Sequence, residues 1–240
     1  MLGAMATHAD TTAALAALLA DPTRAGVCLA LADGRAWTAT ELCRHTGVGA
    51  STMSAHLGRL VGGGVLVERR QGRHRYVALA DPEIAGLVEA LAARAAPGAA
   101  VAPTLRAHRA QDALARGRTC YDHLAGALGC AVAEAMVRRG LLTADLGVGE
   151  EGRAWFAELG APLPERGRRP LARGCLDWTE RRRHLAGAAG AVLCAHVFAV
   201  GWCERVGSSR AVRLTAAGRA GLGEALGGVD VSSGGEASAV

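Results

Sequence analysis

The sequence has no lysine, few aromatic residues and no long apolar run. All 27 cationic side chains are arginine, and against 22 acidic residues they leave a formal net charge of +5. So mild an excess neither requires nor excludes a nucleic-acid partner, and the position of the arginines carries more information than their number. Aromatic residues make up only 3% of the chain, although half of it is hydrophobic. A core built from Ala, Leu and Val favours closely packed helices over an aromatic-rich β-sandwich.

The lack of long apolar segments also bears on location. No apolar run reaches the roughly 18 residues that a membrane-spanning helix needs, and residues 1–10 lack the basic start of an export signal. The seven cysteines are odd in number and spread along the chain, which is typical of reduced thiols and not of a disulfide framework. We therefore expect a soluble, cytoplasmic protein without a membrane partner.

Helix signals are clear in the first third of the chain. Thr38 or Thr40 is expected to cap one helix, with Glu41 completing a capping box in the first case. A further helix over 51–63, capped by Ser51, carries apolar residues at the i, i+4, i+7 spacing of one buried face. Those apolar residues are Met53, Leu57 and Leu60.

After the glycines at 62–64 the pattern changes from helical to strand periodicity. Segments 65–70 and 73–79 predict a β-hairpin around Gln71-Gly72, and a helix is expected over 82–94. A helix, a short turn, a second helix and a basic hairpin form the layout of a winged helix-turn-helix. The expected fold class is mainly α with small β-hairpins (α+β): a winged helix-turn-helix followed by two smaller winged-helix-like repeats.

The second helix and the hairpin hold the residues suited to DNA. The major groove admits one α-helix, and small polar residues on its exposed N-terminal half can approach base edges and phosphates. Arginines of the hairpin are placed to follow the phosphate backbone or to enter the minor groove. The residues expected to contact double-stranded DNA are Thr40, Ser51, Thr52, Ser54, Ala55, His56, Arg59, Arg69, Arg70, Arg73, His74 and Arg75.

Three phrases of the sequence resemble the ArsR family of bacterial winged-helix regulators: LADPTRAGVCLAL, TELCRHTGVGASTMSAHLGRL and VLVERRQGRHRYVAL. The resemblance covers residues 12–95. It implies a homodimer paired through its first and last helices, here about 11–20 and 82–95. Such a dimer represses transcription from an inverted-repeat operator and leaves the DNA when a metal, a thiol oxidant or a small molecule binds. DNA binding itself requires no cofactor.

One familiar metal motif of the family is altered here. Metal-sensing members often carry Cys-x-Cys in the third helix, where this chain has Cys43 and His45. A thiolate and an imidazole are both zinc ligands, but two ligands do not make a site, and a small core residue behind Leu42 is the competing interpretation. The helix over 82–94 also lacks the paired Asp/His pattern of another common site. We therefore expect the first domain not to sense a metal by these routes.

The rest of the chain contains similar phrases twice. Cys120-Tyr121-Asp122 precedes one HLAG segment, and Cys175-Leu176-Asp177 precedes another. They predict two pseudo-repeats, about 104–160 and 170–226, with coincidence among Ala- and Gly-rich helices as the alternative. The predicted organisation is a DNA-binding and dimerisation domain over 1–96, a linker over 97–103, an effector domain over 104–226 and a disordered tail over 227–240.

The repeated Cys, Asp and His allow three interpretations. If the repeats face each other, these groups converge on a metal or a small ligand. Alternatively, Cys120 and Cys175 form a dithiol switch. In a purely structural role each Cys is buried, each Asp caps the helix that follows it and each His packs within its repeat. The candidate effector residues are Cys120, Asp122, His123, Cys175, Asp177 and His184.

Two other function classes compete with a regulator. An enzyme with Cys120 as nucleophile and His123 as base is disfavoured, because the sequence has no nucleophile elbow, phosphate loop or HExxH phrase. We expect no catalytic residues. A winged-helix protein-interaction module without sequence-specific DNA binding is the remaining alternative, and four arginines in the hairpin argue against it.

Overall fold

The computed structural model describes residues 7–72, 74–95, 105–207 and 209–229. The chain divides into two compact units, residues 1–88 and 89–240. Among the described helices, no single one is long and apolar enough to cross a membrane. The first two helices reach that length only together, and the chain bends by 84° between them.

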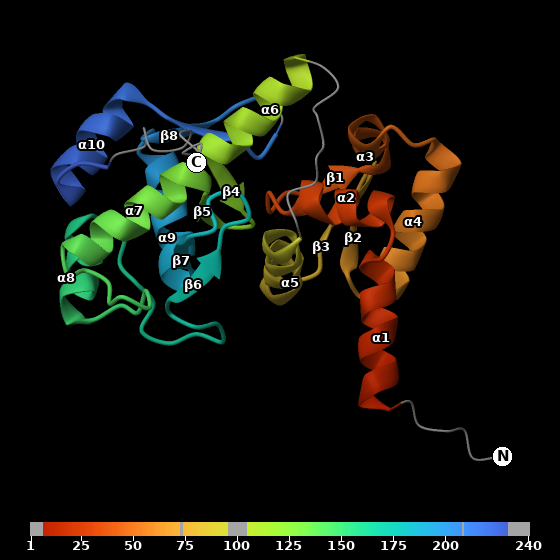
Figure 1. The fold of residues 1–240 in the computed structure, drawn as a ribbon, viewed down its shortest axis with the longest axis horizontal. Helices are drawn as coiled ribbons and strands as arrows, with labels where there is room; N and C mark the ends of the chain where they lie inside the picture. The colour runs from red at the N-terminus through yellow and green to blue at the C-terminus, as the bar shows by residue number, and fades with distance from the viewer. Residues whose placement is uncertain (1–6, 73, 96–104, 208, 230–240) are drawn as a thin grey trace, which may run out of the picture. The chain divides into compact units, whose positions relative to one another are not determined.

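The first unit is a winged helix-turn-helix (Figure 1). Its antiparallel sheet has the strand order β1-β3-β2, so the predicted hairpin is confirmed. Strand β1 was not predicted from the sequence; it pairs Trp37 with Val77 on β3. The elements are α1 (His8–Leu19), α2 (Pro22–Leu31), β1 (Trp37–Thr38), α3 (Ala39–Thr46), α4 (Ala50–Gly62), β2 (Leu66–Gln71), β3 (His74–Leu79) and α5 (Pro82–Arg94), which crosses the boundary between the units.

Helices α3 and α4 begin in different ways. Thr38 and Glu41 form the predicted capping box at α3, each accepting a backbone hydrogen bond from the other. The prediction that Ser51 caps the next helix is wrong. Helix α4 begins at Ala50, and its N-cap is Gly49, which has no side chain to bond the first N–H groups. The first turn of α4 therefore keeps donors that a bound anion can satisfy.

The second unit is also helical with small antiparallel hairpins, as expected. Its sheets are three two-stranded pairs, β4-β5, β6-β7 and β8-β9, and one buried apolar cluster joins residues from Leu124 to Leu226. The elements are α6 (Leu105–Arg116), β4 (Arg118–Cys120), β5 (His123–Ala125), α7 (Gly126–Arg138), α8 (Glu150–Glu158), β6 (Arg173–Leu176), β7 (Arg183–Ala186), α9 (Gly187–Ala199), β8 (Cys203–Arg205), β9 (Val212–Leu214) and α10 (Ala216–Leu226).

From the sequence, the two HLAG segments were expected to be helical. In the structure they are not helical. His-Leu-Ala forms strand β5 in one segment and the end of β7 in the other, and only the glycine begins the following helix. Gly126 and Gly187 have φ of +73° and +83°, a region that side chains disfavour. A Cβ on Gly126 would lie 2.6 Å from the Ala115 carbonyl oxygen. Glycine thus allows each strand to turn directly into a helix.

The two halves of the second unit share part of their element order. Each has a hairpin followed by a helix of 13 residues, α7 or α9, and each helix contacts the hairpin of the other half (α7 with β7, α9 with β5). The later elements differ: β8 and β9 precede α10, whereas only an isolated bridge between Leu142 and Val148 precedes α8. The duplication itself therefore stays a prediction.

Candidate nucleic-acid interface and thiol–imidazole cluster

Helix α4 has one buried and one exposed face. Met53, Leu57 and Leu60 are at most 1% exposed, as predicted. The opposite face is open to solvent and begins at the uncapped N-terminus. Its exposed residues are Ser51, Thr52, Ser54, Ala55 and Arg59. Burial on one side fixes the helix, so the other side can present short polar groups in a set geometry.

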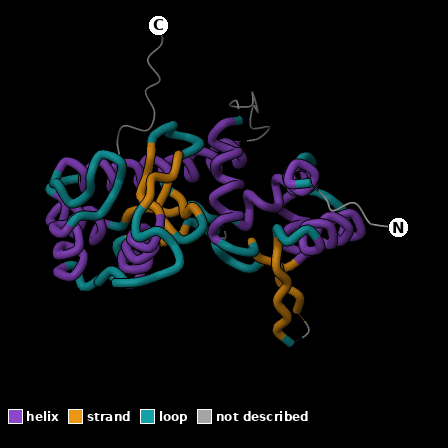
Figure 2. Tube along the Cα trace, turned by 90° about the horizontal axis from the view of Figure 1, so that it is seen from below, coloured by secondary structure: helices purple, strands orange, loops and turns teal. Residues whose placement is uncertain are grey.

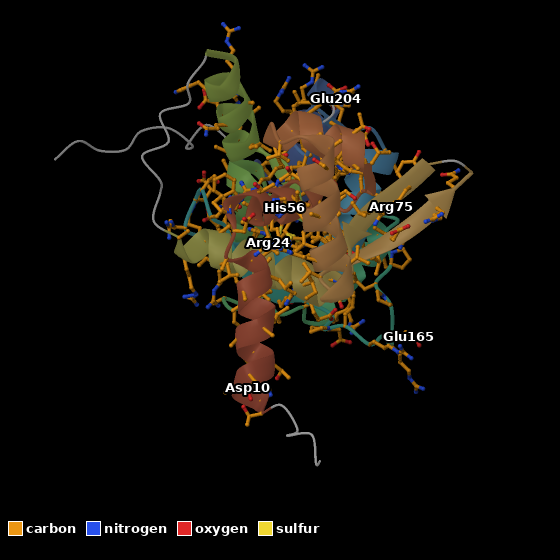
Figure 3. The ribbon with its side chains drawn as sticks, turned by 90° about the vertical axis from the view of Figure 1, so that its right-hand side faces the viewer. Asp10, Arg24, His56, Arg75, Glu165 and Glu204 are labelled. Carbon is orange, nitrogen blue, oxygen red and sulfur yellow. The ribbon has the colours of Figure 1, made fainter. Side chains whose placement is uncertain are left out.

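His56 is less exposed than the other predicted DNA contacts on α4. Its side chain is 14% exposed, and its Nδ1 lies 3.8 Å from Asp21 at the start of α2. In Figure 3 His56 is drawn over the helices, and Arg75 lies on the hairpin at the right of the view. His56 thus lies close to the N-cap of α2, and its contact with DNA stays a prediction. Thr40, in the first turn of α3, is exposed.

The β2–β3 hairpin forms the wing and extends beyond the helices as a long strand pair (Figure 2). Arg69, Arg70 and Arg75 are exposed. Glu68 was missed in the sequence analysis: its carboxylate lies 3.2 Å from Arg70 Nε and 2.7 Å from Arg75 Nε. One acidic residue thus offsets part of the positive charge of the wing. Arg73 and the side chain of His74 lie outside the described residues.

We call α4 and the β2–β3 wing the reading head. Its exposed groups come from one helix terminus and one strand pair, both attached to the buried core of the first unit. That Arg and small polar residues of this surface contact DNA stays a prediction.

Among the described residues, no group of three or more metal-ligating side chains includes Cys43 or His45. Cys43 is partly buried on α3, and the His45 ring packs edge-on against Trp37 at a centroid distance of 5.6 Å. Groups of three or more metal-ligating side chains occur within the described residues only in the second unit.

In the second unit, four groups from the two repeated phrases converge. Cys120, His123, Cys175 and His184 each offer a ligand atom, and these atoms all lie within 4.8 Å of one another. The two sulfurs are 4.0 Å apart, and the two imidazole rings are 5.1 Å apart between centroids. We call these four residues the thiol–imidazole cluster. Convergence, one of the three interpretations left open by the sequence, is thus observed for four of the six candidate residues, and a role as an effector site stays a prediction.

Strand pairing explains how these groups meet. Cys120 is the register partner of His123 across β4–β5, and Cys175 is the partner of His184 across β6–β7. Directly paired residues of an antiparallel ladder present their side chains on the same face, about 5 Å apart. Each hairpin therefore supplies one thiol and one imidazole, and contact between β5 and β7 brings the two pairs together.

The two aspartates do not cap the helices that follow them. Asp177 accepts a 2.7 Å hydrogen bond from Gly126 N, at the start of α7 in the other half. It also pairs at 2.9 Å with Arg118, and both side chains are fully buried. Asp122 is bound at 2.5 Å by Arg169, a residue that the sequence analysis did not connect with this region.

Each aspartate also lies behind a histidine of the cluster. Asp122 Oδ1 is 3.2 Å from His123 Nδ1, and Asp177 Oδ2 is 3.3 Å from His184 Nδ1. Burial alone would raise the pKa of Asp177, but its contacts with His184, Arg118 and Thr179 outweigh burial and hold that pKa well below its usual range. For Asp122 the contacts with His123 and Arg169 outweigh burial in the same way and lower its pKa to about 2. Both carboxylates are therefore anionic partners for the imidazoles.

Five of the seven thiols fall into two groups. The contact with Cys175, together with burial, raises the pKa of Cys120, and the same contact lowers the pKa of Cys175. Burial raises the pKa of Cys28, Cys194 and Cys203 to about 12. Inert buried thiols are thus separated from a pair whose protonation is shared.

Comparison with known proteins bears on both units. A family model described as a helix-turn-helix domain matches residues 19–69. The chain is 38% identical over 212 residues to the HTH-type transcriptional regulator YdfF of Bacillus subtilis (strain 168). That match covers 86% of this chain and 93% of the relative, so it includes the second unit.

Two further similarities each cover about two fifths of this chain. A probable mercury resistance operon repressor of Streptomyces lividans is 37% identical over 94 residues, which are 39% of this chain and 74% of that protein. The homodimeric winged helix-turn-helix domain of Mb0332 from Mycobacterium bovis, a possible ArsR-family regulator, is 29% identical. It covers 38% of this chain and 86% of its own, with a TM-score of 0.34.

The near-complete match to the Bacillus regulator decides the family. With that match, and with the family model on residues 19–69, the chain belongs to the helix-turn-helix transcriptional regulators.

Proposed function

We propose that this regulator is a homodimeric repressor that binds an inverted-repeat operator through the reading head. The carrying observation is the exposed polar face of α4, which begins at an uncapped N-terminus and lies opposite a fully buried apolar face. Small polar side chains and free N–H groups suit the major groove, and Arg69, Arg70 and Arg75 of the wing suit the adjacent phosphates. A module that binds only proteins would not need this arrangement of donors.

Exposed apolar surface supports the dimer. Helix α1 has no buried residue although it contains three leucines, and on α5 the side chains of Leu87 and Leu91 are 37% and 49% exposed. Such residues are normally covered, and an isologous dimer covers the same patch on both protomers. Two reading heads related by a twofold axis would match the two halves of an inverted repeat.

The proposed regulation is loss of DNA affinity when an effector binds. One relative that matches the first unit is a probable mercury resistance operon repressor. In this chain the described residues of the first unit hold no cluster of metal ligands. The effector site is therefore assigned to the second unit.

Electrophoretic shift on duplex from the gene's own upstream DNA tests the proposal. Specific binding should exceed binding to a scrambled duplex by about 10³ or more. Two sets of phosphate contacts should make affinity fall with a slope of several units in a log–log salt plot. Equal affinity for both duplexes at physiological salt would leave only the protein-interaction alternative.

A further inference from the structure

We propose that the thiol–imidazole cluster is a four-coordinate site for a thiophilic divalent cation of the Zn²⁺ and Cd²⁺ class, and that its occupancy is the regulatory signal. The second half of this statement rests on the proposed function, because it needs a DNA-binding protein to regulate. The first half stands on the second unit alone.

The spacing of the ligand atoms fits such an ion. All four lie within 4.8 Å of one another. Tetrahedral Zn²⁺ with Zn–S bonds of about 2.3 Å separates two ligating sulfurs by about 3.8 Å, and the sulfurs of Cys120 and Cys175 are 4.0 Å apart. A disulfide would need about 2.05 Å. The present separation therefore matches two ligands of one ion better than a bonded pair.

The histidines are oriented as metal ligands. Nε2 of His123 and both ring nitrogens of His184 are buried without a hydrogen-bond partner among the described residues, although His184 Nδ1 lies 3.3 Å from the Asp177 carboxylate, and the two residues are 4% and 0% exposed. An unpaired buried nitrogen is costly. Nδ1 of each ring faces a carboxylate, Asp122 or Asp177. A carboxylate behind Nδ1 that leaves Nε2 free is the usual support of a metal-bound imidazole.

Charge and burial select the class of ion. Two thiolates and two neutral imidazoles around a divalent cation make a neutral centre, which a buried site tolerates. The thiol protons leave to solvent as the ion binds. Mg²⁺ and Ca²⁺ prefer oxygen ligands and are excluded by this donor set, whereas a tetrahedral S₂N₂ set is typical of Zn²⁺ and its heavier congener.

Occupancy would join two hairpins that are far apart in the sequence. Cys120 and His123 come from β4–β5, and Cys175 and His184 from β6–β7. An ion that is coordinated by all four residues links the two hairpins. It stabilises only the arrangement in which the hairpins meet. A regulated equilibrium needs such a difference in affinity between two states.

The site is tested by titrating the reduced, metal-free full-length protein with Co²⁺ and with Cd²⁺. We expect one ion per chain, the intense visible bands of tetrahedral Co²⁺, and thiolate-to-metal charge-transfer absorption with both ions. Cys120→Ser and Cys175→Ser should lose the charge-transfer band at concentrations that saturate the parent. Cys203→Ser is the matched control, because it removes a buried thiol of the same unit away from the cluster, and it should bind as the parent does.

A second variant keeps the ligands intact in case a Cys variant folds poorly. Asp122→Asn leaves all four ligands in place and removes the carboxylate behind His123. Cd²⁺ affinity should fall about 10- to 100-fold, with unchanged circular dichroism. Unchanged affinity would contradict the proposed orientation of His123.

The regulatory half has its own readout. Cd²⁺ should weaken operator binding by the parent and by Cys203→Ser, but not by Cys175→Ser. If the absorption bands of the bound metal appear but operator affinity does not fall, the regulatory claim is overturned and the metal site stands. Absence of metal spectra in a protein that still binds its operator would overturn the site itself. A Cys120–Cys175 disulfide formed by mild oxidant in that protein would then support the dithiol switch in its place.

Discussion

The reading head and the thiol–imidazole cluster expose their chemical groups in opposite ways. On α4 and the wing the polar groups are exposed and only the anchoring residues are buried, since DNA must reach them. In the second unit the Cys and His groups are themselves mostly buried, and so are Asp177 and Arg118 behind them. The contrast is what the two proposed roles require: a surface that a large anionic partner can reach, and a buried site that selects a small ligand by desolvation and donor type.

The largest effect is expected from the buried ion pair of the second unit. Asp177→Asn leaves the Arg118 guanidinium buried without its anionic partner and should destabilise the second unit by about 3–5 kcal/mol. Glu134→Gln is the matched control, because the Arg182–Glu134 pair is more than a third exposed on both sides and should change stability by less than about 1 kcal/mol. Urea unfolding measures both. Equal free energies of unfolding for the Asp177→Asn and Glu134→Gln variants would show that the Asp177 contacts contribute little.

The corresponding change in the first unit is a cavity under the reading head. Leu57 is 1% exposed, so Leu57→Ala should destabilise this unit by about 2–5 kcal/mol and reduce operator affinity. Ser54→Ala, on the exposed face of the same helix, should leave stability nearly unchanged. Cd²⁺ binding by the Leu57 variant should persist. A joint loss of both activities would contradict the assignment of the two functions to separate units.

Within the reading head, helix and wing are expected to differ in kind. Thr52→Ala or Ser54→Ala should change which bases are preferred, by about 1–3 kcal/mol per lost contact. Arg75→Ala should weaken binding to all sequences alike and reduce the salt slope by about one unit. Binding selections on randomised operators distinguish these outcomes. Wing variants that alter base preference while Ser54 variants do not would show that α4 is not the recognition helix.

The smallest effect concerns the acidic residue of the wing. Glu68→Gln removes the partner of Arg70 and Arg75 and should raise affinity for operator and scrambled DNA by a few-fold, with a steeper salt dependence. Glu83→Gln on α5 serves as a control of equal charge change. An identical salt slope for parent and Glu68→Gln would mean that these arginines do not face phosphates.

The sequence predicted the first unit better than the second, for a physical reason. Helix α4 and the wing are specified by local signals: a 3.6-residue apolar period through Met53, Leu57 and Leu60, and a Gly-containing turn between strands. Strands β5 and β7 have three and four residues, too few to show an alternating pattern, and their Ala and Leu suited the helix prediction equally well.

The surroundings of the cluster depend on tertiary contacts that no local pattern encodes. Repetition of Cys, Asp and His indicated which residues matter. The contact of Arg169 with Asp122 spans 47 positions, and that of Arg118 with Asp177 spans 59. The role of each Asp behind a His became visible only with the strand register.

The central claim is that binding at the cluster and reading of DNA are coupled, and thermodynamic linkage tests it most directly. Cd²⁺ affinity is measured on the full-length protein with and without saturating operator duplex, and operator affinity with and without saturating Cd²⁺. Coupling requires the same factor in both experiments, on the order of 5- to 150-fold. The account predicts equal factors that favour Cd²⁺-bound, DNA-free protein. A Cd²⁺ affinity that is identical in the presence and absence of operator would contradict it.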